Sequence, residues 1–358
     1  QKPPSGHVIP MSASVVIGKI DRPMTLVFQD QDGMKIPTLR GPTAFVPAAM
    51  NASDYGLPNN GGEIAVSVER LLDPSNQECI GLPAALLVAS MMTGKEPLTN
   101  LVATGGLAED GSTVAVADLL TLLRGIPPAG DQIVLAPEGN LTQLYDLALM
   151  GKLDLLLQHQ IYTAEDLKAA EAIALDPPER ITRARALFAD VQTLGTSMDF
   201  SELVTNASVR ERLLEVLKHA PQHASAKVLL DAGSGGIPAA MTLEGSLFAL
   251  EQAAMPIFKQ MEGTADPVIE SATVFAEIRS DLSSVRAKLD RSAVSLSDDL
   301  TDFVEELEEY SQLNNRTSSR GVGMLAQLRA TWSRVGSTHQ SLRSGAKSAP
   351  AGQEGGSG

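Results

Sequence analysis

Residues 66–125 form the part of the chain around which the other elements are expected to be arranged. Residues 63–69 alternate apolar and polar positions, which predicts a strand. In residues 78–94 the apolar positions recur at helical spacing, with Pro83 near the start and Gly94 at the end, which predicts a buried helix. Residues 101–107 predict a short buried strand that runs into a glycine turn. A strand, a buried helix and a second strand in this order indicate an α/β core.

Shorter elements are predicted on both sides of this core. Before it we expect two strands joined as a hairpin, a third strand and a short helix, at residues 12–20, 24–29, 34–39 and 44–51. After it, a hairpin-like turn at residues 109–112 leads into a strand at 113–116. Three helices are then expected, at residues 116–123, 141–150 and 164–174.

The second half of the chain is predicted to be helical. Asp176, Pro177, Pro178 and Glu179 mark the boundary, because two consecutive prolines cannot continue a helix. An amphipathic helix follows at residues 180–194, and a helical hairpin at residues 209–232 weakly resembles a tetratricopeptide unit. The glycine-rich residues 233–238 are expected to interrupt the helical structure.

From residue 241 onward, apolar residues recur at alternating steps of three and four. This period predicts four helices that pack as a bundle or coiled coil, at residues 243–261, 268–289, 296–310 and 325–335. The acidic residues of the third helix are expected to form a solvated face: Asp298, Asp299, Asp302, Glu305, Glu306, Glu308 and Glu309. The predicted fold class is therefore an α/β (α+β) head at residues 12–175 and a helical domain at residues 176–343. An extended lead, residues 1–11, and a disordered tail, residues 344–358, complete the chain.

Composition excludes several classes of function. The formal net charge of −15 over 358 residues argues against nonspecific nucleic-acid binding and against docking on an anionic membrane. Aromatic residues make up only 4% of the chain, so a stacking platform for bases or sugars is not expected. No run approaches the ~20 apolar residues of a membrane span.

The single cysteine and the first residue bear on the compartment. One cysteine excludes an intramolecular disulfide and a cysteine-rich metal site. The sequence begins with Gln1 rather than Met, as expected of a mature end after signal-peptide removal or of a shortened chain. A periplasmic or secreted location and a cytoplasmic one therefore both remain open.

Several short motifs resemble the proteolytic domain of the Lon family of Ser-Lys peptidases. In that family a Gly-Pro-Ser-Ala-Gly motif precedes a buried helix that ends in Thr-Gly. Aligned without gaps, Gly81 takes the second motif glycine, Thr93-Gly94 ends the helix and Thr104-Gly105 matches a Thr-Gly-Glu turn. Residues 133–140 resemble the Val-Leu-Ile-Pro-x-Glu-Asn segment of the family, and residues 153–157 and 161–167 resemble its closing strand and helix. The resemblance covers residues 12–175 and implies a Lon-protease-like head, which in that family commonly assembles into rings.

The resemblance ends where the family carries its chemistry. The position of the nucleophilic serine holds Cys79, and the position of the general-base lysine holds Leu122. A Ser-Lys dyad needs an amine of lowered pKa within hydrogen-bond reach of the hydroxyl, and no lysine lies between Lys95 and Lys152. Thr104 resembles the threonine that supports the lysine, but opposite Leu122 its hydroxyl is expected to stabilise the turn.

Cys79 itself has two interpretations. At the start of a helix the dipole favours a thiolate, which attacks carbonyl groups. A cysteine is also a small, soft residue that fills the space of a lost serine. The filling role is favoured, since Glu78 would raise the pKa of the thiol and neither His nor Lys is adjacent in the sequence.

No cofactor or metal is predicted. His219 and His223 are four residues apart, but Pro221 breaks the helical face that a zinc-binding pair would need, which favours a surface loop. Residues 91–95 do not form a phosphate-binding loop, because the glycine spacing before Gly94-Lys95 is missing. The ATPase module usual in the Lon family is therefore absent from this sequence, and no ATP binding is expected.

Three functions remain. The first is a non-catalytic, Lon-like pseudopeptidase that acts in assembly or in binding a protein partner, with self-association through the head and the C-terminal helices. The second is an ATP-independent peptidase in which Cys79 works with a non-standard base. The third is a helical-repeat adaptor whose head is a passive cap. Leu122 favours the first, a protein without enzymatic activity.

Overall fold

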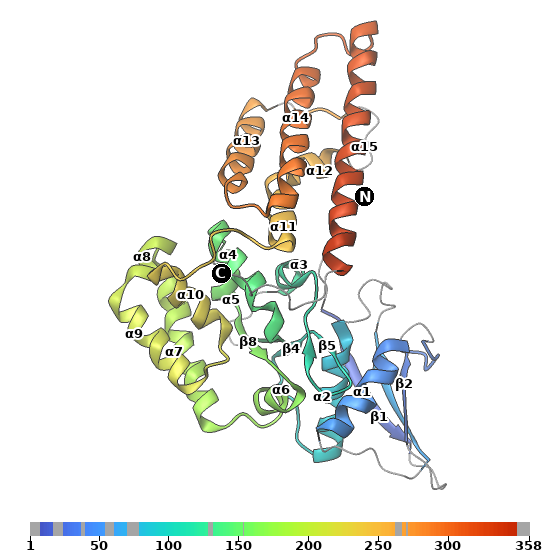
Figure 1. Ribbon diagram of the computed structural model, residues 1–358, viewed down its shortest axis with the longest axis vertical. Helices are drawn as coiled ribbons and strands as arrows, with labels where there is room; N and C mark the ends of the chain where they lie inside the picture. Colours follow the sequence, from blue (N-terminus) through green and yellow to red (C-terminus); the bar gives the residue numbers. More distant parts are fainter. Residues whose placement is uncertain are drawn as a thin grey trace, which may run out of the picture. The chain divides into compact units, whose positions relative to one another are not determined.

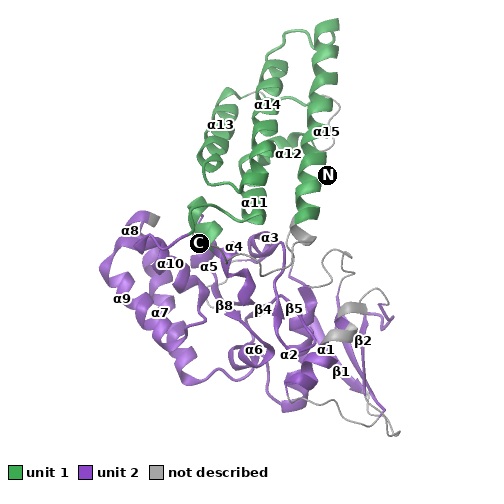
Figure 2. Ribbon diagram, in the orientation of Figure 1, with its two compact units in different colours: residues 1–5, 145–151, 238–350 green, residues 6–144, 152–237, 351–358 purple. Residues whose placement is uncertain are grey.

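The computed structural model describes residues 8–16, 24–36, 40–53, 61–69, 79–127, 132–152, 154–261, 267–269 and 271–348. Within them the fold is mixed α/β, with many helices and small sheets (Figure 1). The chain forms two compact units (Figure 2). The α/β unit holds residues 6–144, 152–237 and 351–358, and the helical unit holds residues 1–5, 145–151 and 238–350. The chain passes between the units near residues 144, 151 and 237, and Asp176 lies inside the α/β unit.

The first sheet of the α/β unit holds β3 (Glu63–Val68) between β1 (Met11–Val16) and β2 (Thr25–Gln29). β1 is antiparallel to β3, whereas β2 is parallel to it. The predicted hairpin of the first two strands is therefore wrong. Parallel neighbours require a crossover connection, and α1 (Arg40–Ala52) lies in the connection from β2 to β3, so β1 takes the other edge.

Little of the strand predicted at residues 34–39 is present in the described chain. Lys35 forms an isolated antiparallel bridge with Gln29. The Lys35 amine also pairs with the Glu63 carboxylate at 2.8 Å. Residues 37–39 lie outside the described residues.

α2 (Gly81–Thr93) forms where the buried helix is predicted. Pro83 lies in its first turn, and Gly94 ends it with φ 69° while its amide donates to the Ser90 carbonyl. α1, α6 (Leu167–Ala174) and β1 all pack against α2. A helix covered on several sides is apolar around most of its circumference, which is why its sequence shows so few polar positions.

The second sheet is parallel, with β7 (Ile133–Pro137) between β4 (Leu101–Ala103) and β8 (Gln160–Ala164). All residues of β7 and β8 are buried, as expected of parallel strands that are covered on both faces. The closing strand predicted at residues 153–157 is wrong, because α5 (Asp154–Gln158) occupies this segment. Apolar runs of this length do not separate helix from strand. The β-branched and aromatic residues of β8 mark the actual strand.

A small hairpin follows β4. β5 (Gly106–Leu107) pairs antiparallel with β6 (Thr113–Val114) around the predicted turn, so the strand expected at residues 101–107 is divided in two. α3 (Leu119–Gly125) begins three residues later than the helix predicted from residue 116. α4 (Leu141–Met150) has the predicted bounds and follows a short 3₁₀ helix, Glu138–Asn140.

Four further helices complete the α/β unit. α7 packs against α9, α9 against α10, and α10 against both α8 and β8. α9 and α10 confirm the helical hairpin predicted at residues 209–232, and Gly235 ends α10 with φ 75°. Their bounds are α7 (Glu179–Gly195), α8 (Phe200–Thr205), α9 (Ala207–His219) and α10 (Ala224–Ser234).

The helical unit confirms three of the four helices predicted from the heptad spacing, whereas the first, predicted at residues 243–261, is divided at Ala254 into α11 and α12. Figure 1 shows α13, α14 and α15 side by side, with α11 packed against α13 and α15. α15 continues to Ser348, so residues 344–348 of the predicted disordered tail are helical, and residues 349–358 lie outside the described chain. The bounds are α11 (Leu243–Ala253), α12 (Met255–Met261), α13 (Ala272–Arg286), α14 (Val294–Ser311) and α15 (Ser319–Ser348).

The acidic face of α14 is only partly solvated, which corrects the sequence expectation. The carboxylate of Asp298 pairs with Arg286 at 2.7 Å. Asp299 pairs with Arg334 of α15 at 3.0 Å, and Glu308 pairs with Arg279 of α13. Heptad spacing puts these acids beside α13 and α15, where they tie the three helices together. No helix in the described parts of the chain combines the length and the apolarity needed to span a membrane.

Candidate functional site at the start of α2

The N-terminal end of α2 is held against the turn between β4 and β5 by the backbone. The Gly105 amide donates to the Cys79 carbonyl at 2.9 Å, and the Leu82 amide donates to the Gly105 carbonyl at 2.8 Å. A Cβ at Gly81 would lie 3.2 Å from the Leu107 nitrogen, so the two segments approach closely. The structure therefore brings the Cys79 position and the Thr104-Gly105 turn together.

Gly105 has a conformation and surroundings that suit glycine alone. Its φ is 142°, and an added Cβ would lie 2.7 Å from Pro137 Cγ. Thr104, directly before it, is 8% exposed and its amide donates to the Leu135 carbonyl at 3.0 Å. Its Oγ1 has no hydrogen-bond partner among the described residues. The Thr104 hydroxyl therefore does not stabilise the turn in the predicted way.

Cys79 is half-buried in the turn that precedes α2. Its carbonyl binds Gly105, and the helix begins two residues further on, at Gly81. The preceding residues 70–78, which include the predicted neighbour Glu78, lie outside the described chain.

At the carboxyl edge of the parallel sheet, where α/β proteins commonly bind ligands, the β5–β6 hairpin binds the end of β8. The Thr113 amide donates to the Glu165 carbonyl at 2.9 Å, directly after β8. The Leu167 amide donates to the Gly111 carbonyl at 3.0 Å. The β5–β6 hairpin thus closes over the end of β8, and Pro137 at the end of β7 contacts the Gly105 position.

Leu122 lies half-buried on α3, a helix held by two buried amides that sequence reasoning missed. Asn140 is fully buried and binds both polar groups of the Val116 backbone, accepting from its amide at 3.0 Å and donating to its carbonyl at 2.6 Å. Gln143 accepts from the Leu119 amide at 3.2 Å. The sequence does contain a sign of these buried amides: Gln143 and Asp146 are polar residues within the apolar run of α4, at positions that face the core.

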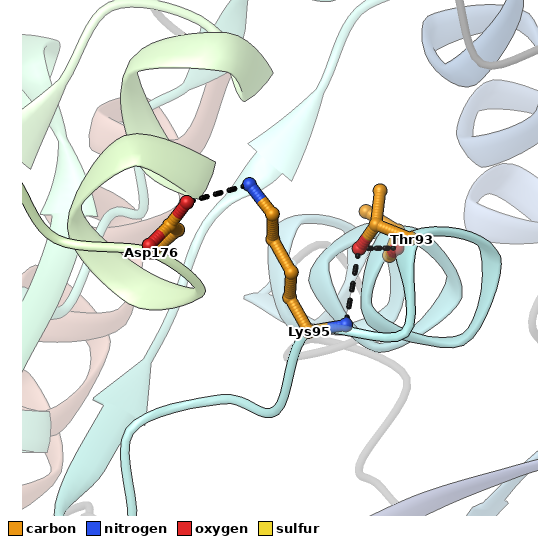
Figure 3. A network of polar contacts seen from close by, with 4 residues as sticks. Thr93, Lys95 and Asp176 are labelled. Carbon is orange, nitrogen blue, oxygen red and sulfur yellow. Dashed lines mark hydrogen bonds and ion pairs between the residues drawn. The ribbon is translucent and has the colours of Figure 1, made fainter.

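Lys95, the last lysine before Leu122 in the sequence, is engaged at the far end of α2 (Figure 3). Its amine pairs with the Asp176 carboxylate at 2.7 Å, and its amide donates to Thr93 Oγ1 at 3.4 Å. The Thr93 hydroxyl in turn donates to the Ala89 carbonyl at 2.8 Å. This is an ordinary helix C-terminus with an exposed ion pair.

His223 is buried rather than exposed, which corrects the predicted surface loop, whereas His219 is half-buried. His223 is fully buried between the rings of Tyr162 and Phe188, at centroid distances of 4.5 and 4.4 Å. Its Nδ1 accepts from the Ala226 amide at 3.3 Å and caps α10, so the neutral ring carries its proton on Nε2. Burial lowers the pKa of His223 to about 3. A histidine is a rare N-cap, and the pattern gave no sign of this role.

His219 is not part of that cluster. It lies on α9 and contacts the Glu215 carboxylate at 3.1 Å, four residues earlier. In the described parts of the chain no group of three or more His, Cys, Asp or Glu residues could hold a metal ion. Comparison of the chain with protein-family models and with curated proteins found no match.

Proposed function

We propose that this protein is a non-catalytic, Lon-like pseudopeptidase that acts in assembly or in binding a protein partner. The observation that carries the proposal is Leu122 in the position of the general base. A leucine side chain has no group that accepts a proton, so it cannot activate a nucleophile at Cys79.

The backbone at the start of α2 supports the same conclusion. Acyl transfer needs free amide groups that point at the developing oxyanion. The Leu82 amide, in the first turn of the helix, already donates to the Gly105 carbonyl at 2.8 Å. The β5–β6 hairpin also binds the end of β8 in the neighbouring sheet.

Lys95 does not replace the missing base. α2 contains 13 residues, which at a rise of 1.5 Å each span about 20 Å. Cys79 precedes this helix and Lys95 follows it, and the Lys95 amine binds Asp176. A lysine side chain does not reach across that length.

For the binding role, each unit offers a helix with an exposed apolar side chain. Leu214 on α9 and Val322 on α15 are 55% and 59% exposed, although both are large apolar residues. Single exposed apolar residues are common in monomers, so they serve as positions to probe. Light scattering after size exclusion measures self-association. If the surface around Leu214 or Val322 takes part in it, Leu214→Asp or Val322→Asp should lower the measured mass. A strict monomer at all concentrations would contradict the self-association part of the proposal.

The lack of catalysis is tested through Cys79, the only cysteine of the chain. We expect its reaction with iodoacetamide to follow an apparent pKa at or above the ~8.5 of an ordinary thiol. Fluorescent casein should be hydrolysed no faster by the wild type than by Cys79→Ala. An apparent pKa below ~7, with casein hydrolysis that Cys79→Ala abolishes, would instead establish the cysteine peptidase. If residues 176–343 retain all partner binding, the helical-repeat adaptor is the better description.

A further inference from the structure

Asp146 is a buried carboxylate that joins two segments of the helical unit. It lies on α4, is 1% exposed, and accepts two hydrogen bonds from Thr242, from the amide at 3.0 Å and from the hydroxyl at 2.6 Å. Thr242 is the N-cap of α11, and its Oγ1 accepts from the Gly245 amide at 3.0 Å. The carboxyl group of Asp146 therefore binds the N-cap residue of α11 through both its backbone amide and its side chain.

Gly245 provides the space for this carboxyl group. A Cβ at Gly245 would lie 2.1 Å from Asp146 Oδ2 and 2.3 Å from Asp146 Cγ. Any larger residue would displace the carboxyl group from the first turn of α11. Gly245 and Asp146 thus lie together where α4 approaches the first turn of α11.

The charges around Asp146 do not neutralise it. Among the described residues Asp146 forms no ion pair. Glu244 on α11 adds a like charge. The Lys288 amine donates to the Leu149 carbonyl at 2.6 Å, and Asp290 donates its amide to Ser246 Oγ at 2.7 Å. On α4 itself Asp146 is the only Asp, Glu, Lys, Arg or His.

We propose that Asp146 is a pH-sensitive latch of the helical unit, whose protonation strengthens the attachment of the α11 N-terminus to α4 and whose ionisation weakens it. The contact between Asp146 Oδ2 and Thr242 Oγ1 persists in both states, because either oxygen can supply the hydrogen. Only the ionised state places an unpaired charge in a buried site, and that charge carries the cost.

The titration falls near neutral pH. Burial raises the pKa of Asp146 from 3.8 to about 7, opposed by the hydrogen bonds from Thr242. Because the folded-state pKa is the higher one, the folded unit keeps a proton that the unfolded chain releases. The stability that Asp146 provides is complete below pH ~4 and is lost as the pH rises to ~7. The shift of about three pH units corresponds to a change of up to ~1,000-fold in the unfolding equilibrium constant.

The test compares wild type with Asp146→Asn in the full-length protein, using urea unfolding from pH 4.5 to 9. Trp332, the only tryptophan, packs against Phe258 and Phe303 inside the helical unit and reports its unfolding by fluorescence. We expect the wild-type equilibrium constant to rise by 100-fold or more from pH 4.5 to 7.5, while Asp146→Asn changes less than 10-fold. Asp302→Asn, which removes an exposed acid of the same unit, should retain the wild-type profile.

A second variant keeps the proposal testable if Asp146→Asn does not fold. Glu244→Gln removes the like charge beside Asp146 and should move the midpoint of the wild-type transition to lower pH. Carboxyl carbon chemical shifts in NMR give the Asp146 titration directly, and an ordinary acidic midpoint would overturn the proposal. An unchanged pH profile in Asp146→Asn, or an unmoved midpoint in Glu244→Gln, would overturn it as well.

Discussion

Replacing Gly105 by alanine should destabilise the α/β unit more than any other single methyl addition near α2. At φ 142° a side chain is strained, at a cost of about 1–3 kcal/mol. The new Cβ would lie 2.7 Å from Pro137 Cγ and 3.0 Å from Pro137 Cδ. The proline ring is rigid and buried at the end of β7, so it does not yield as a flexible side chain does, and overpacking adds about 1–3 kcal/mol. The two costs together come to about 2–6 kcal/mol.

The same substitution at Gly94 is the matched control. Gly94 also has a positive φ, 69°, but a Cβ there would meet no atom within 4 Å. Gly94→Ala should therefore cost only the left-handed backbone penalty, about 1–2 kcal/mol. The assay is the urea dependence of Cys79 labelling, because Cys79 borders the Gly105 turn. If Gly105→Ala shifts the labelling midpoint no further than Gly94→Ala, the contact with Pro137 is not limiting and the reasoning is refuted.

Two further substitutions test the α/β unit by the same labelling assay. Asn140→Ala leaves the buried Val116 amide without its acceptor and should lower the free energy of unfolding by about 2 kcal/mol. The exposed Thr142→Ala is the control and should change it by less than about 0.5 kcal/mol. The folded-state pKa of His223 is lowered from 6.5 to about 3, so its contribution is complete above pH ~6.5 and falls by up to about 1.4 kcal/mol per pH unit below that. His223→Gln should flatten this acid loss, and an unchanged slope would show that another group controls it.

The sequence predicted helices and strands well where an element carries its own boundary signals. α2 has a proline in its first turn and a glycine at its end, and the heptad spacing located the helices of the second half. The strand in residues 153–157 failed because a short apolar run does not distinguish the helix α5 from the strand β8. The hairpin of β1 and β2 failed because pairing depends on which strand lies between them, and β3 comes later in the chain.

In the candidate site, the sequence predicted the glycine turns of the backbone but not which polar side chains are buried. Gly94 was predicted to end the helix and residues 101–107 to run into a glycine turn, and both Gly94 and Gly105 have positive φ. The burial of Asp146 and His223 was not predictable, because it depends on segments about 100 and 60 residues away. The role of a polar residue in an apolar run can be assigned only when the segments that pack over it are known.

The buried titratable groups lead to one conclusion about the chain as a whole: its two units should respond to pH in opposite directions. His159 and His223 in the α/β unit are buried with lowered pKa values, so acid removes stability there. Asp146 in the helical unit has a raised pKa, so acid adds stability. Between pH ~4 and ~6.5 the two effects offset each other in any signal that averages over both units.

The chain provides one probe for each unit, since Cys79 lies in the α/β unit and Trp332 in the helical unit. On acidification, the urea midpoint for Cys79 labelling should fall while the midpoint for Trp332 fluorescence rises. Midpoints that move together would show that one of the two buried groups does not govern its unit.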